Sequence, residues 1–221
     1  ILERSGDRIC IDWGYLYLPD INGQVSLANP LTMEDYFCQT GNLPAYEGEI
    51  ISNDRSSMPV MAYVRHFGKT SQARSFMLIG YDEIKDIRYM NVDYPAYWAR
   101  QGKSITQAFE EMRDNYRQIM DLCREQDKII YEDALRAGNE KYAELLSASY
   151  RQCLAAHKLF QDNKGNILYF SKENNSNGCV NTVDLSYPSA PLFLLYNTTL
   201  LKGMIRSILD YCQSEQWGFD D

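Results

Sequence analysis

The spacing of apolar residues between positions 104 and 212 is the feature that most constrains the fold. Apolar residues recur there at steps of three and four, which is typical of amphipathic helices. Ser104 and Gln107 have the form of a capping box, and Gly138 is placed to end the first helix. A second helix is predicted over residues 139–160 and a third helical region from Pro188 onward. The short joint at Gly138 predicts that the first two helices form an αα-hairpin.

A polar segment interrupts this helical pattern. Residues 167–172 and 179–185 are two short runs of strand type, and the Asn-rich residues 174–178 between them are typical of a turn. The sequence therefore predicts a β-hairpin over residues 167–184. Its density of polar side chains suits either an ordinary turn or a ligand site. Any chemistry is expected there.

The first part of the chain alternates as a half-buried sheet does. Strands are predicted over residues 9–18, 59–64 and 74–81, with a turn at 68–71 that predicts an antiparallel pair between the last two. Residues 19–58 form a long irregular insertion, in which one short helix is predicted near residues 33–38. The fold class is therefore α+β, with a β-domain portion over residues 1–98 and a helical-hairpin portion over residues 99–221.

Composition excludes several classes of function. With 22 Lys and Arg against 30 Asp and Glu, the net charge is -8, so we expect no nucleic-acid partner. The longest apolar run, residues 190–196, is far too short for a membrane span. The six cysteines lack the paired spacing of zinc sites, and no metal or other cofactor is expected. We expect the chain to be a segment of a longer polypeptide.

Two carboxylates of the polar segment are the candidate catalytic residues. In the predicted register, Glu173 and Asp184 share one face of the hairpin about 13 Å apart. Glycosidase pairs stand about 5 to 9.5 Å apart, so these two do not make such a pair by themselves. Cys179, with His66 or His157 as base, is a weaker candidate nucleophile.

Several segments together resemble the glutaminase A family of fungal and bacterial proteins. Tyr-Arg-Gln at 150–152, Ala-Ala-His-Lys-Leu at 155–159 and Phe-Ser-Lys-Glu-Asn-Asn-Ser-Asn-Gly at 170–178 carry the resemblance. It continues in Thr-Val-Asp at 182–184 and through residues 187–197. Upstream, Ile-Asp-Trp-Gly-Tyr-Leu-Tyr at 11–17 and residues 76–84 are similar to the junction between the two domains of that family.

The resemblance implies both a fold and an activity. The fold would be the C-terminal part of an antiparallel β-sandwich, followed by the first αα-hairpins of an (α/α) six-hairpin toroid that carries the β-hairpin as an insertion. The activity would be hydrolysis of glutamine to glutamate and ammonia, in a secreted or periplasmic protein. The remaining hairpins of the full-length chain would be the partners of this segment.

For that activity we expect Glu173 to act as general base or acid and Asp184 to assist it. The residues expected to bind the substrate are Lys172, Asn174, Asn175 and Tyr187. Two other functions are open. One is a carbohydrate-active six-hairpin protein with a glycan in place of a small-molecule substrate, and the other is a non-catalytic ligand-binding domain that uses the hairpin loop as a recognition surface.

Overall fold

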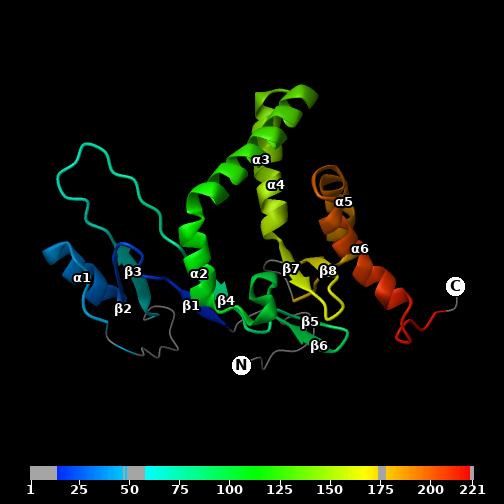
Figure 1. Cartoon of the computed structure of the whole chain (residues 1–221), viewed down its shortest axis with the longest axis horizontal. Helices are drawn as coiled ribbons and strands as arrows, with labels where there is room; N and C mark the ends of the chain where they lie inside the picture. Colours follow the sequence, from blue (N-terminus) through cyan, green and yellow to red (C-terminus); the bar gives the residue numbers. More distant parts are fainter. Residues whose placement is uncertain (1–13, 47, 49–57, 174–177, 220–221) are drawn as a thin grey trace. The chain divides into compact units, whose positions relative to one another are not determined.

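The computed structural model describes residues 14–46, 48, 58–173 and 178–219 (Figure 1). They form two compact units, one over Tyr15–Tyr81 and the other comprising Gly14 and the described residues from Asp82 onward. The α+β class is confirmed, because helices and small antiparallel sheets both occur. No helix among these residues is long and apolar enough to cross a membrane.

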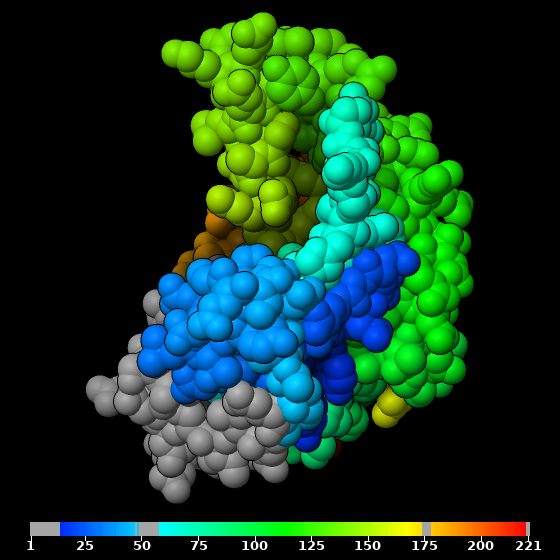
Figure 2. All heavy atoms as spheres, turned by 90° about the vertical axis from the view of Figure 1, so that its left-hand side faces the viewer, coloured from blue at the N-terminus to red at the C-terminus, as the bar shows by residue number. Residues whose placement is uncertain are grey.

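The first unit is built around a two-stranded sheet and one helix. Its elements are β1 (Tyr15–Tyr17), β2 (Gln24–Ala28), α1 (Pro30–Thr40), β3 (Val60–Val64) and β4 (Gly80–Asp82). β2 and β3 pair antiparallel, and Ala28, Met33 and Leu43 pack between the sheet and α1. Asn29 caps the start of α1, and Gly41 ends it in the left-handed conformation that suits glycine. α1 faces the viewer in Figure 2, with nearly all of its side chains at the surface.

Strand pairing in this unit differs from the prediction. β2 lies inside residues 19–58, which were expected to be irregular, and β3 pairs with β2 rather than with residues 74–81. β4 pairs with β1 instead, so the turn at residues 68–71 does not join a hairpin. Of the predicted strand at residues 9–18, the part before Gly14 lies outside the described residues. Local turn chemistry indicated where the chain bends but not which strands meet.

The second unit combines two β-hairpins with helical pairs. Its elements are β5 (Ile87–Tyr89), β6 (Val92–Tyr94), the 3-10 helix η3 (Tyr97–Gly102), α2 (Ile105–Asp114), α3 (Tyr116–Ala137), α4 (Glu140–Ala155), β7 (His157–Gln161), β8 (Ile167–Ser171), α5 (Val183–Tyr196) and α6 (Thr198–Cys212). The antiparallel pairs are β5 with β6 and β7 with β8. α3 packs against α4, which confirms the predicted αα-hairpin.

The capping box at Ser104 is confirmed, because its side chain accepts from the Gln107 amide and the Gln107 side chain accepts from the Ser104 amide. The long helix predicted after it is divided at Asn115 into α2 and α3. The Asn115 side chain donates to the Glu111 carbonyl at 2.9 Å, and the Asn115 backbone amide donates to the same carbonyl at 3.0 Å, so Asn115 closes the end of α2.

The prediction of a β-hairpin over residues 167–184 is wrong, because its first strand pairs with the segment before it and not with the segment after it. The strand at Ile167–Ser171 pairs with His157–Gln161, which was expected to end a helix, and Val183–Tyr196 is a helix. Asp162 forms the turn, since its carboxylate accepts from the amides of Lys164 and Asn166 at 2.9 and 2.8 Å. Among the described residues of this segment, an isolated bridge between Lys172 and Val180 is what remains of the predicted pairing.

β8 lies between two apolar clusters, and its two faces pack against different elements of the unit. Leu168 and Phe170 pack with Phe160, Ile87 and Tyr94 on one face of the strand. Tyr169 points to the other face and packs with Phe193 of α5 and Met204 of α6. α6 lies close to the strand at Gly203, where an added Cβ would stand 3.0 Å from the Ile167 carbonyl oxygen.

Candidate functional site

A buried charge cluster connects β7 with the segment between β4 and β5. The ammonium group of Lys158 donates to the carboxylate of Glu83 and to that of Asp86, the latter at 2.5 Å. The side chains of Lys158, Glu83 and Asp86 are only 15%, 9% and 5% exposed. Ionisable groups this deeply buried are uncommon and need partners.

The alternation of β7 explains how Lys158 reaches this position. Leu159 belongs to the cluster around Tyr169, whereas Phe160 packs with Ile87 and Tyr94. Since residues two apart share a face of a strand, Lys158 points to the same side as Phe160, toward the β5 and β6 hairpin. The two carboxylates come from the turn that leads into that hairpin.

Strained backbone holds the two carboxylates. Ile84, between them, has φ of 63°, a left-handed conformation that a β-branched residue rarely adopts. Its amide donates to the Asp82 carboxylate at 2.8 Å, and the Asp86 amide donates to the Tyr94 carbonyl at 2.9 Å. Such strain persists only where the surroundings determine it, and it concentrates at functional sites.

Burial changes the acid–base properties of the cluster. Loss of hydration and the hydrogen bond to Asp86 raise the pKa of Glu83 to about 7, although Lys158 acts in the opposite direction. For Lys158, burial lowers the pKa, but the hydrogen bonds to Asp86 and Glu83 outweigh it and the pKa lies above its ordinary value. Lys158 therefore stays charged while Glu83 exchanges a proton near neutral pH. General acid–base catalysis needs a group of this kind.

The residues predicted from the sequence to form the site lie elsewhere. Lys172 and Glu173 follow β8, where the Lys172 amide donates to the Ala156 carbonyl at 2.9 Å and the Glu173 amide to the Cys179 carbonyl at 3.2 Å. Asp184 and Tyr187 are exposed on α5, with Tyr187 80% exposed. Because Asp184 lies on a helix, the estimate of 13 Å along a strand does not apply. Asn174 and Asn175 lie outside the described residues.

A network of short polar side chains fixes the chain before α5. Asn181, in a left-handed conformation with φ of 53°, donates to the Met204 carbonyl at 3.1 Å and to the Ser207 hydroxyl. Its carbonyl oxygen accepts from the Ser186 hydroxyl at 3.0 Å, which in turn lies 3.2 Å from the hydroxyl of Ser171. These bonds tie Ser171 and its neighbours to α5 and α6.

The two histidines have other roles than activating a cysteine. Nδ1 of His157 donates to the Cys153 carbonyl at 2.6 Å, its ring stacks on Tyr169 at 4.5 Å, and burial lowers its pKa. His66, in the first unit, hydrogen-bonds Asn42 at 3.0 Å. In the described part of the chain neither histidine bonds Cys179, so the structure does not support the alternative of a Cys–His nucleophile. Nor do three or more His, Cys, Asp or Glu side chains gather there to hold a metal ion.

Glu83, Asp86 and Lys158 were not predicted as a group from the sequence. Glu83 and Lys158 are 75 residues apart, and no local motif joins them. The one available signal was a lysine beside Leu159 and Phe160, in a run that the helical pattern assigned to a helix. Once that run is known to be a strand, a charge on its apolar face needs an anionic partner.

Comparison with known proteins divides the chain into two matched stretches. Residues 2–133 match the family model of a domain of unknown function, DUF5127, and residues 139–220 match that of the glutaminase A six helical-hairpin domain. The chain is 28% identical over 209 residues to glutaminase A of Aspergillus oryzae, covering 90% of this chain and 30% of that protein. It is 34% identical over 85 residues to a protein of Arthroderma benhamiae named as a probable glutaminase, covering 38% of this chain and 10% of that protein.

The chain thus spans 30% or less of the length of these two relatives. No solved structure matches it. Glu83 and Asp86 lie in the first matched stretch and Lys158 in the second, so the buried cluster draws on both.

Proposed function

This chain belongs to the glutaminase A family, and on that premise we propose that it is part of an amidohydrolase that converts glutamine to glutamate and ammonia. The observation that carries the proposal is the buried cluster of Glu83, Asp86 and Lys158. Because the chain spans 30% of the matched glutaminase A, the activity is proposed for the full-length protein.

Amide hydrolysis requires two proton transfers. Water adds to the amide carbon as a base removes its proton, and the C–N bond then breaks as an acid protonates the nitrogen, which leaves as ammonia. In the proposal Glu83, with its pKa of about 7, accepts the first proton and returns it to the nitrogen. Lys158 keeps the charge of the cluster balanced, and Asp86 raises the proton affinity of Glu83.

The spacing of the carboxyl groups favours amide over glycoside hydrolysis. Glu83 and Asp86 lie within hydrogen-bonding reach of each other and share one ammonium group. A glycosidase pair must stand about 5 Å or more apart, so that the sugar and water fit between the two groups. The cluster therefore suits a single acid–base group better than two groups that act on opposite sides of a glycosidic bond.

A second assignment places the chemistry at Glu173 and Asp184, with Lys172, Asn174, Asn175 and Tyr187 binding the substrate. This assignment stays a prediction from the sequence. Its catalytic carboxylates differ from Glu83 in location, and mutation separates the two assignments.

The test is a comparison of three Glu→Gln variants in the full-length protein, with ammonia release from glutamine as the measurement. We expect Glu83→Gln to lower kcat by about a hundredfold or more, because the acid–base group is lost. Glu173→Gln should stay within a few-fold of wild type. Glu132→Gln, which changes an exposed glutamate on α3, is the matched control.

Other outcomes would contradict parts of the proposal. A large loss in Glu173→Gln with full activity in Glu83→Gln would move the site to the segment after β8. Wild-type protein that releases reducing sugar from a glycan panel but no ammonia from glutamine would reject the amidohydrolase function.

A further inference from the structure

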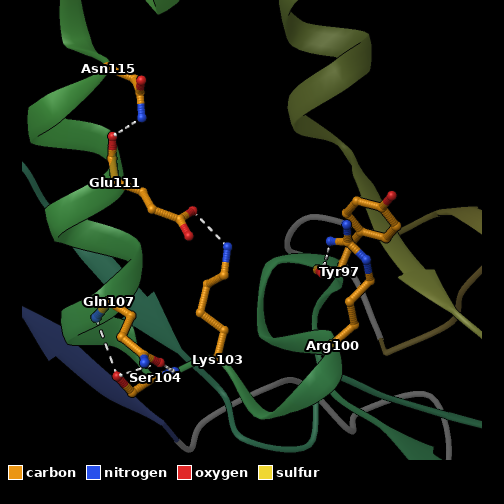
Figure 3. A network of polar contacts seen from close by, with 7 residues as sticks. All are labelled: Tyr97, Arg100, Lys103, Ser104, Gln107, Glu111 and Asn115. Carbon is orange, nitrogen blue, oxygen red and sulfur yellow. Dashed lines mark hydrogen bonds and ion pairs between the residues drawn. The ribbon is translucent and has the colours of Figure 1, made fainter.

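A charged pocket lies between the end of η3 and α2, and Figure 3 shows several of its side chains. It belongs to the same unit as the buried cluster. Its volume is about 540 Å³, and all of its lining residues are polar or charged except Gly102. Small-molecule sites of this size are ordinary, but most are lined by apolar side chains. A wall made almost wholly of charges and amides therefore suits a small and highly polar ligand.

Local structure builds both walls of the pocket. Gln101 and Gly102, the last two residues of η3, have φ of 70° and 77°, and these consecutive left-handed residues turn the chain ahead of α2. On the other side Gln107, Glu111 and Asn115 follow each other at intervals of four along one face of the helix, as Figure 3 shows. The capping box holds Gln107, and Asn115 is bonded to the Glu111 carbonyl. The walls are thus held by hydrogen bonds.

One opposite-charge pair inside the pocket is already neutralised. The ammonium group of Lys103 lies 2.6 Å from the Glu111 carboxylate. In Figure 3 these two side chains reach toward each other from the two walls. Their charges are satisfied without a ligand.

Three further charged residues line the pocket, and one of them, Asp114, is paired with Arg113 at 2.8 Å. The Arg100 guanidinium lies over the Tyr97 ring, 3.6 Å from its centroid, and donates to the Tyr97 carbonyl at 2.7 Å. Across the described part of the chain, no ion pair involves Arg100 or Glu110. Arg100 and Glu110 are therefore the two charges of this wall that no ion pair of the described residues occupies, and Arg113 acts on Glu110 only through a weaker electrostatic attraction. Guanidinium groups suit carboxylates because their donors form a planar fork.

We propose that this pocket binds a zwitterionic α-amino acid, with its carboxylate on Arg100 and its ammonium group on Glu110. The identity of that amino acid as glutamine rests on the proposed function. η3 packs against β7, the strand that carries Lys158, so the pocket shares a structural element with the proposed acid–base cluster.

The test uses calorimetric titration of the full-length protein with three ligands. L-Glutamine carries both charges, glutaramic acid lacks the ammonium group, and 4-aminobutanamide lacks the carboxylate. Arg100→Gln should weaken binding of L-glutamine and glutaramic acid by about tenfold to a hundredfold and leave 4-aminobutanamide unchanged. Glu110→Gln should weaken L-glutamine and 4-aminobutanamide and leave glutaramic acid unchanged.

Two exposed charges on α3 provide matched controls. Arg124→Gln and Glu132→Gln remove the same charges outside the pocket and should not change any of the three affinities. Absence of measurable L-glutamine binding to the wild type, or equal losses for all three ligands in each variant, would overturn the proposal.

The ammonia assay separates this inference from the proposed function. Glutamine hydrolysis that keeps its KM in both pocket variants rejects the pocket and leaves the amidohydrolase standing. Charge-selective binding without any ammonia release supports an amino-acid site and rejects the hydrolysis.

Discussion

Two groups of opposite charges in the second unit differ in their contact with water. Around Lys158 the side chains are at most 15% exposed, whereas Lys103 and Glu111 in the pocket are 33% and 58% exposed. Burial raises the pKa of Glu83 to about 7, so that this carboxyl group becomes a proton carrier. Water around the pocket stabilises full charges instead. The same residue types thus serve proton transfer in one place and recognition of charge in the other.

The largest expected effect comes from removing the buried cation. Lys158→Met would leave two carboxyl groups in an apolar setting without their counter-charge, and we expect a loss of about 3 kcal/mol or more in the free energy of unfolding. Urea denaturation measures it. A loss of under about 1 kcal/mol, the range of exposed pairs, would show that the cluster is hydrated and would remove the contrast with the pocket.

A smaller effect is expected in the pH dependence of stability. The pKa of Glu83 is raised on folding from 4.5 to about 7, so the folded state binds more protons than the unfolded state between these values. Stability from this group is therefore fully present below about pH 4.5 and is lost as pH rises to about 7, by up to about 3 kcal/mol. Glu83→Gln should remove this slope in denaturation curves recorded across that range.

The contribution of Glu83 is the difference in pH-dependent stability between wild type and Glu83→Gln, because His157 changes stability with pH in the opposite direction. Burial lowers its pKa, so its contribution is lost as pH falls below about 6.5. Glu111→Gln, in the hydrated pocket, is the control and should keep the wild-type slope. An unchanged slope in Glu83→Gln would mean that Glu83 titrates normally.

The smallest effect is expected in the pocket. Lys103→Met breaks an exposed ion pair, and we expect the free energy of unfolding to fall by less than about 1 kcal/mol, with part of that removed by added salt. Parallel denaturation of Lys103→Met and Lys158→Met tests the comparison directly. Equal losses would contradict the assignment of one cluster to the interior and the other to the surface.

Helical elements were predicted well from the sequence because their signals are local. The Ser104 capping box and the glycine after Ala137 act within one turn of the helix they delimit. The division at Asn115 was missed, since the apolar spacing runs on across it. Over residues 157–161 the three- and four-residue spacing continued by chance into a strand, and the predicted hairpin moved by one strand as a result.

The candidate site was predicted less well, because density of polar residues is a weak signal. Residues 172–178 are polar in sequence, yet the carboxyl group whose pKa is raised to about 7 is that of Glu83. Glu83 lies beside Ile84, whose left-handed conformation could not be predicted from the sequence. Glu83 and Asp86 meet Lys158 across 75 and 72 residues. Such a cluster exists only after β7 has paired with β8 and has packed on the β5 and β6 hairpin.

The sequence by itself determined the α+β class, the ends of several helices, the αα-hairpin and the resemblance to the glutaminase A family, since each depends on residues within a few positions of one another or on a pattern shared by relatives. Only the tertiary structure decided which strands pair, which carboxylates are buried and where a lysine meets them. The physical reason is that hydration and hydrogen bonding of an ionisable group are set by neighbours that are distant in the chain. Protonation near neutral pH, the property on which the proposed chemistry depends, is therefore a property of the packed molecule.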